Sequence, residues 1–209
     1  GFSMILTIVF GVGSGVLMAV KKDRLLDHVL GTFSTVALYL PGFWIAIVLI
    51  FIFAEQWKIL PSSGISDGSG FIIPAITLAL PSIGVCARLT RSAILDEIGR
   101  QYMTVADAKG MSRRRAVIRH AFGNALIPII TYLGNHMAGI IGGASIVETI
   151  FAIPGIGSYA IAGVQSKDYY VVQAYVLFSG CIYVLTNILI ELIYLALDPK
   201  IRAGEAVES

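Results

Sequence analysis

The segment YYVVQAYVLFSGCIYVLTNILI, residues 169–190, decides the fold, because no residue in it carries a charge. A helix needs roughly 17 to 25 predominantly apolar residues to cross the hydrocarbon core of a membrane. Four earlier runs have the same character, at residues 1–20, 29–54, 71–87 and 121–147. The chain is therefore predicted to be all-α, a polytopic helical membrane protein with five spans.

Composition excludes the main alternatives to this class. With 56% hydrophobic and 13% charged residues and a mean hydropathy of +0.83, the chain is too apolar for an ordinary soluble domain. The strands of a transmembrane β-barrel would alternate apolar and polar positions over about ten residues, whereas these runs are continuous. A secretory signal carries its positive charge before the apolar run, but here Lys21, Lys22 and Arg24 follow it, so residues 1–20 are predicted to be a retained span.

The distribution of Lys and Arg predicts the orientation of the chain. Of the fifteen such residues, only Lys58 and Lys167 fall in one set of alternate loops; the others lie in the turn after residue 20, in residues 88–119 and in the carboxyl-terminal segment. By the positive-inside rule the basic side is cytoplasmic. Residue 1 is then expected outside and Ser209 in the cytoplasm. Topology accounts for the positive charge, so nucleic-acid binding is not supported.

Small residues and prolines mark where the spans pack or bend. Gly11-Val12-Gly13-Ser14-Gly15 has the small-xxx-small spacing that lets two helix backbones approach closely in lipid, either within the chain or against another subunit. Pro41 is expected to kink the second span, and Pro74 and Pro81 to bend the third.

The two cysteines, Cys86 and Cys181, have no CxxC or metal-ligand spacing. Both are predicted to be small apolar packing residues.

The longest break in the apolar sequence, residues 88–120, is predicted to be a cytoplasmic loop. Its centre is TVADAKGMSRRR, residues 104–115. Residues 92–108 are compatible with a helix that Gly110 can end and Ser112 can follow as the cap of a second helix, although Arg115 stands where a capping box would need Glu or Gln. A short polar turn would suffice to join two spans, so this loop is predicted to dock a cytoplasmic partner.

Residues 148–157, ETIFAIPGIG, belong to a predicted extracellular gate loop at residues 148–168. This apolar stretch is broken by Pro154 and Gly155 and could turn back into the membrane, where irregular backbone is tolerated only beside protein or a water-filled cavity. A surface loop with a few exposed apolar residues is the alternative.

Motifs for covalent chemistry are absent from the sequence. It contains no phosphate-binding GxxxxGK[ST], no HExxH and no GxSxG, so no enzymatic activity and no cofactor are expected. Polar residues within the predicted spans are candidates to line or brace a passage. They are Asn124, Asn135, His136, Asn187 and Glu191. His136 is either a hydrogen-bonded packing residue between helices or a pathway residue, and Glu191 can reach water or pair with Lys200 or Arg202.

Several motifs together resemble the permease subunits of ATP-binding-cassette (ABC) importers of the dipeptide, oligopeptide and nickel group, and in particular the first of their two permeases. The resemblance covers essentially the whole chain. It rests on ADAKGMS at 106–112, RHA at 119–121, NALIP at 124–128, VETIF at 147–151, PGIG at 154–157, DY at 168–169 with Gln173, and DPKIR at 198–202.

The resemblance implies a type I ABC importer permease fold and assigns roles to two sets of residues. The ATPase-coupling set is Thr104, Val105, Ala106, Asp107, Lys109, Gly110, Met111, Ser112 and Arg113, although only Ala106 and Gly110 agree with the general Glu-Ala-Ala-x-x-x-Gly pattern. The translocation pathway or gate set is Asn135, His136, Glu148, Phe151, Pro154, Gly155 and Gly157. No metal site is implied.

The resemblance also implies where the protein lies and what it assembles with. It places a single permease domain, residues 1–209, in a prokaryotic inner membrane. The expected partners are a second, different permease, two cytoplasmic ATPase subunits, an extracellular solute-binding protein and the lipid bilayer. Family members carry a further span before the point where this chain begins with Gly1, so a truncated six-span subunit is expected. The competing class is an ATP-independent secondary transporter or channel with its coupling site at the midplane.

Overall fold

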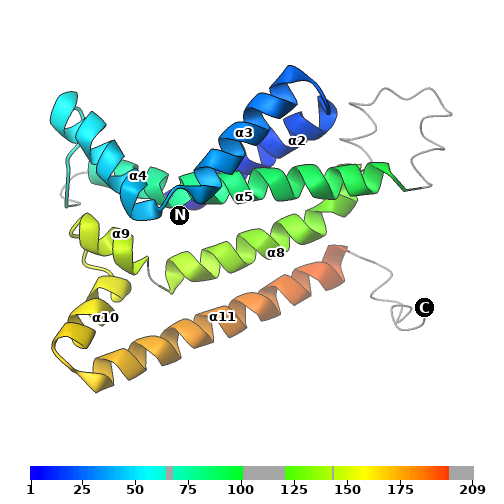
Figure 1. Cartoon of the computed structure of the whole chain (residues 1–209). Helices are drawn as coiled ribbons and strands as arrows, with labels where there is room; N and C mark the ends of the chain where they lie inside the picture. Colours follow the sequence, from blue (N-terminus) through cyan, green and yellow to red (C-terminus); the bar gives the residue numbers. More distant parts are fainter. Residues whose placement is uncertain (65–67, 101–120, 143, 198–209) are drawn as a thin grey trace.

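The computed structural model of the chain describes residues 1–64, 68–100, 121–142 and 144–197. Within these ranges every regular element is a helix (Figure 1), so the predicted all-α class is confirmed. The elements are α1 (Phe2–Leu6), the π-helix η1 (Thr7–Val12), α2 (Gly13–Val20), α3 (Leu25–Tyr39), α4 (Gly42–Leu49), the π-helix η2 (Ile50–Gln56), the 3₁₀-helix η3 (Gly68–Phe71), α5 (Ile72–Ile98), α8 (Phe122–Ile141), α9 (Ser145–Ile150), α10 (Ile156–Gln165) and α11 (Tyr169–Leu197).

Each of the five predicted spans corresponds to helical structure. In the described part of the chain, three continuous helices are long and apolar enough to cross a membrane, namely Phe2–Val20, Gly68–Ile98 and Tyr169–Ile193, and the bent pair α3 and α4–η2 is a fourth if it is counted as one span. The remaining predicted span is α8, which has 20 residues. It is absent from that group because Asn124, Asn135 and His136 interrupt its apolar sequence.

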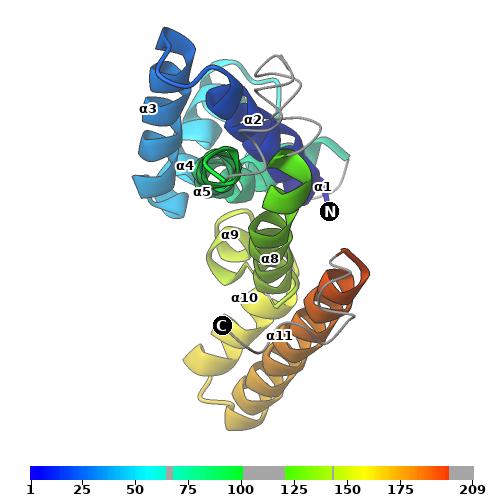
Figure 2. The ribbon, with the colours of Figure 1, turned by 90° about the vertical axis from the view of Figure 1, so that its right-hand side faces the viewer.

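The long helix α5 is central to the arrangement. It packs against α1–η1–α2, α3 and α4 on one side and against α8 on the other, while α8 packs in turn against α11. Figure 2 shows the result: α1 to α5 form one group, and α8 leads from it to α10 and α11.

Glycines set how closely the first helices approach α5. A Cβ added at Gly11 would lie 2.8 Å from Cys86 Cβ, and one at Gly15 would lie 2.5 Å from Thr90 Cβ, whereas one at Gly13 would meet nothing within 4 Å. The small-xxx-small motif therefore packs within the chain, through Gly11 and Gly15.

Proline has different effects at its different positions. At Leu40 the backbone becomes extended, and Pro41 precedes the first turn of α4. The helical path bends by 103° at this point, so the predicted kink is a complete break. The helix α5 instead continues without interruption through Pro81. Pro74 stands in the first turn of α5, where a missing N–H costs nothing because that turn has no intrahelical acceptor.

Only one of the two cysteines packs as predicted. Cys86 is buried against Gly11. Cys181 on α11 is exposed and does not pack within the chain, because α11 touches α8 and α10 along only part of its surface.

Two buried clusters hold opposite ends of the molecule. One joins α2, α5 and α8 through Ala19, Ile94, Ala121, Ala125 and Ile129. It lies at the end where α2 turns into α3 and α5 finishes, which we call the basic end (Figure 1). The other joins α4, α5 and α9 through Ala46, Ile73, Val147 and Phe151 and lies at the end that we call the α9–α10 end.

Candidate functional site

The predicted gate residues form a helix–turn–helix, α9 to α10, instead of an open loop. The Glu148 carboxylate accepts a hydrogen bond from the Ser158 amide at 2.8 Å, and the Gly155 amide donates to Ser158 Oγ at 3.1 Å. A carboxylate is favourable beside the free N–H groups of a helix amino terminus. Glu148 on α9 thus fixes where α10 begins.

Glycine is required beside this carboxylate. A Cβ at Gly155 would overlap the carboxylate atoms of Glu148. One at Gly157 would lie 2.5 Å from Ser145 Oγ. Both predicted gate glycines therefore allow α9 and α10 to approach each other, with Pro154 in the turn between them.

Phe151 anchors the turn in the protein. Its side chain is 1% exposed and packs with Ala46, Ile73 and Val147. Its carbonyl accepts a hydrogen bond from the Gly64 amide at 2.8 Å. Because Gly64 belongs to the connection between η2 and η3, the turn is tied to the preceding connection as well as to α4 and α5.

A cavity of about 560 Å³ adjoins the turn. Its wall is mostly apolar and includes Phe2, Phe71, Leu78 and Val147, while Ser3 and Glu148 supply polar groups. Glu148 therefore borders this space as well as the start of α10. The arrangement can hold a small molecule at the α9–α10 end.

His136 forms a polar contact between α8 and α5. Its Nδ1 lies 3.2 Å from Ser82 Oγ, and the Tyr132 hydroxyl donates to the Ser82 carbonyl at 3.2 Å. The rings of Tyr132 and His136 are parallel, with their centroids 6.0 Å apart. Ser82 Oγ also lies 3.3 Å from the Leu78 carbonyl, to which it donates. Which of the two groups donates in the His136–Ser82 contact depends on the tautomer of the ring.

The His136 ring is held between the two helices. Its other nitrogen, Nε2, is buried and has no hydrogen-bond partner among the described residues. The geometry matches the packing interpretation of His136. The adjacent Asn135 is exposed and takes no part in this contact.

The other sequence candidates are spread apart. Asn124 donates to Glu97 at 3.2 Å, and Asn187 and Glu191 are exposed on α11, whereas Lys200 and Arg202 lie outside the described residues. The whole predicted ATPase-coupling set also lies outside them: Thr104, Val105, Ala106, Asp107, Lys109, Gly110, Met111, Ser112 and Arg113.

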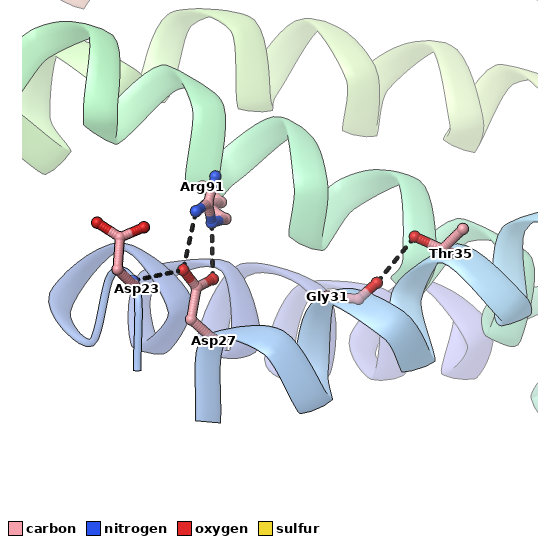
Figure 3. Close-up of polar contacts among 5 residues, drawn as sticks. All are labelled: Asp23, Asp27, Gly31, Thr35 and Arg91. Atoms are coloured by element: carbon pink, nitrogen blue, oxygen red, sulfur yellow. Dashed lines mark hydrogen bonds and ion pairs between the residues drawn. The ribbon is translucent and has the colours of Figure 1, made fainter. Parts of the chain in front are cut away.

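A buried ion pair at the basic end escaped sequence reasoning. Arg91 Nε lies 2.7 Å from Asp27 Oδ1, and the Asp27 side chain is only 5% exposed. Arg91 Nη2 donates to Asp27 Oδ2 at 2.8 Å, and this oxygen also accepts from the Asp23 amide at 3.0 Å (Figure 3). The signal for it was an acidic residue, Asp27, two positions before the predicted span at residues 29–54, where an isolated charge would be costly.

Comparison with known proteins adds a family relationship. The family model described as "Binding-protein-dependent transport system inner membrane component" matches residues 11–203. The probable peptide ABC transporter permease protein y4tP of Sinorhizobium fredii is 38% identical over an alignment of 208 positions, and the match covers 96% of this chain and 66% of that protein. The glutathione transport system permease protein GsiC of Escherichia coli is 32% identical over 200 residues, 96% of this chain and 65% of that protein. The chain thus spans somewhat less than two thirds of these relatives' length.

Solved structures share the fold. The MetNI methionine ABC transporter in an inward-facing conformation superposes with a TM-score of 0.74 over 94% of this chain and 89% of the matched chain, at 16% sequence identity. A second crystal form of the same transporter gives a TM-score of 0.75 at 15% identity. The type I ABC importer permease fold expected from the sequence is confirmed.

Proposed function

Because the chain belongs to the family of binding-protein-dependent transport system inner membrane components, we propose that it is the transmembrane permease subunit of an ATP-driven ABC importer for peptide-type substrates. The observation that carries the proposal is the agreement between the family match over residues 11–203 and a fold shared over 94% of the chain with an ABC transporter. The relatives named above are permeases for peptides and for glutathione, which favours a short peptide over nickel as the substrate.

The proposed mechanism is alternating access, driven by ATPase subunits that are separate from this chain. Two separate ATPase subunits close on ATP and move the coupling loop at residues 88–120, and rigid helices carry that movement to the gate loop at residues 148–168. The helix α5 supports this route, because it runs without interruption from the third span into the first part of the coupling loop, residues 88–98, and packs against α8. The chain itself hydrolyses nothing.

The proposed assembly follows from the same relationship. The chain pairs with a second, different permease in the inner membrane of a prokaryote and receives substrate from an extracellular binding protein. The basic end faces the cytoplasm and the α9–α10 end faces outward, in accord with the positive-inside rule.

Reconstitution of the complete transporter in proteoliposomes tests this function. Uptake of a labelled dipeptide is expected only when ATP, both ATPase subunits and the binding protein are present. Uptake by the permease alone without ATP would instead support the secondary-transporter class. Nickel uptake by the complete system, without dipeptide uptake, would overturn the choice of peptide.

Gly110→Val tests the coupling step. If Gly110 takes the proposed left-handed conformation, a β-branched residue is strained there. The variant is expected to insert in the membrane and to leave ATP turnover present but no longer linked to uptake. Unchanged uptake would refute the assignment of Gly110 as the hinge. Ser112→Ala is the comparison variant, because it makes a milder change in the same loop.

A further inference from the structure

A polar groove lies at the basic end, between α3 and α5. It encloses about 560 Å³. His28, Thr32 and Thr35 line it at helical spacing on one face of α3, and Arg88 and Ser92, one turn apart on α5, line it from the other side. The groove therefore presents hydrogen-bond donors from two helices to one space.

The charges in the groove do not cancel. Asp27 is bound by both Nε and Nη2 of Arg91, so that pair is neutral. Arg88 is exposed and has no acidic partner among the described residues; its Nη1 donates to Thr35 Oγ1 at 3.4 Å. Thr35 in turn donates to the Gly31 carbonyl at 2.9 Å, which fixes its hydroxyl as an acceptor (Figure 3). Most of the Arg88 guanidinium remains free to bind an anion.

The surroundings of the groove are apolar and uncovered within the chain. Along the outer face of α3, Val29, Phe33 and Val36 are 57%, 53% and 52% exposed. Arg88 directly follows the third predicted span, at the membrane boundary, and a charged residue beside such an apolar face is best matched by a counter-charge that comes with apolar material. The phosphate of a lipid supplies the charge and its acyl chains cover α3, whereas a free phosphate or a soluble peptide would leave this face bare.

We propose that this groove binds the headgroup phosphate of an anionic phospholipid. Arg88 binds the phosphate oxygens, His28, Thr32 and Ser92 supply further donors, and the acyl chains lie along Val29, Phe33 and Val36. Basic pockets between transmembrane helices are suited to such headgroups. The exposed Lys21, Lys22 and Arg24 in the α2–α3 turn add attraction for an anionic membrane surface without belonging to the groove.

Retention of phosphatidylglycerol by the purified, fully assembled transporter tests the proposal. Native mass spectrometry after titration with phosphatidylglycerol gives the apparent affinity, and no ATP is required, so the result is independent of transport. Arg88→Gln is expected to weaken retention about ten-fold, the loss of one charge-assisted contact. Arg88→Lys keeps the charge but loses the paired N–H donors of the guanidinium. Its retention of phosphatidylglycerol is expected to lie between those of Arg88→Gln and the unmodified protein.

Control variants separate a site from general attraction. Arg24→Gln makes the same change of charge in the exposed turn and is expected to retain phosphatidylglycerol within about two-fold of the unmodified protein, because a single surface charge contributes little. Thr32→Val tests the groove with no change of charge and is expected to weaken retention several-fold. A melting temperature equal to that of the unmodified assembly shows that each variant is folded.

Three results would overturn the assignment. The first is equal loss of retention in Arg24→Gln and Arg88→Gln, and the second is equal retention of phosphatidylcholine and phosphatidylglycerol. The third is Arg88-dependent binding of inorganic phosphate or of a dipeptide with no Arg88-dependent retention of phosphatidylglycerol.

Discussion

At the scale of single residues, stability depends most on positions where the helices touch without room to spare. The amino-terminal helix and α5 meet through Gly11 and Gly15, and Gly84 brings α5 close to α3, since a Cβ there would lie 2.5 Å from the Ser34 carbonyl. Without a hydrophobic driving force between helices in lipid, such close packing supplies much of the association energy.

Gly15→Ala is expected to destabilise the protein by about 1 to 3 kcal/mol, the usual cost of overpacking. The new methyl group would meet the Ala87 carbonyl at 2.7 Å, and backbone cannot give way as a flexible side chain can. Gly13→Ala is the matched control, because its methyl group meets nothing within 4 Å. Thermal unfolding in detergent should show a lower midpoint for Gly15→Ala and an equal or higher one for Gly13→Ala.

The Asp27–Arg91 pair is expected to contribute about 2 kcal/mol, as hydrogen bonds to charged groups do. The figure stays below that of a fully buried pair because the Arg91 side chain is 32% exposed. Asp27→Asn and Arg91→Met should each lower the unfolding midpoint, and the double variant should lose less than the sum of the two. Additive losses would contradict a direct interaction, and Arg24→Gln controls for the change in charge.

At the scale of elements, the α9–α10 turn is organised by one carboxylate. Glu148→Ala removes the acceptor from the amino terminus of α10 and is expected to cost about 1 kcal/mol, as the loss of a helix cap does. Hydrogen exchange at the Ser158 amide should accelerate. Glu148→Gln keeps an oxygen acceptor and should accelerate this exchange less. Gly155→Ala should accelerate it as much as Glu148→Ala, because the new methyl group at residue 155 displaces the Glu148 carboxylate.

The neighbouring Thr149→Ala is the control for this prediction, since Thr149 is exposed and donates only within α9. If Thr149→Ala accelerated exchange at Ser158 as much as Glu148→Ala, the change would reflect weakening of α9 and not loss of the cap.

The length of the apolar runs predicted where the helices lie better than it predicted how the helices contact one another. Uncharged runs located the helices, and the clash between the Pro41 ring and the preceding residue located the break. Pro81 shows the limit of that rule, because α5 is packed on several sides and these contacts outweigh one missing hydrogen bond.

The candidate site was predictable in composition but not in arrangement. Pro154, Gly155 and Gly157 marked a turn, yet nothing in the sequence places Glu148 against the start of α10 ten residues away. Likewise a contact between helices was one of two interpretations of His136, whereas its partner Ser82 lies 54 positions away and could be found only from the packing of α5 on α8. The Asp27–Arg91 pair was missed for the same reason.

At the scale of the whole molecule, the two ends differ in charge. This difference predicts from which side of the membrane a cysteine introduced at each end can be labelled. The α2–α3 turn and the end of α5 lie at one end; the end of η2 and the α10–α11 connection lie at the other (Figure 1). In sealed cells, Lys58→Cys and Lys167→Cys are expected to react with an impermeant maleimide added outside. Lys22→Cys should react only after permeabilisation.

The exposed Cys181 should first be replaced by Ser in all three labelling variants, while Cys86 is buried and can stay. Labelling of Lys22→Cys from outside in sealed cells would reverse the proposed orientation. Labelling of all three variants from one side would contradict a chain that crosses the membrane between these ends.

The break at Pro41 has a mechanical consequence. Since the path bends by 103° between α3 and the α4–η2 arm, the two arms lie nearly crosswise. A shift of α3 along its own axis would therefore move the far end of η2 mainly sideways to the axis of that arm. The Phe151 carbonyl holds the Gly64 amide just beyond that end. A small stroke delivered at one membrane face would therefore reappear at the opposite face as a transverse swing.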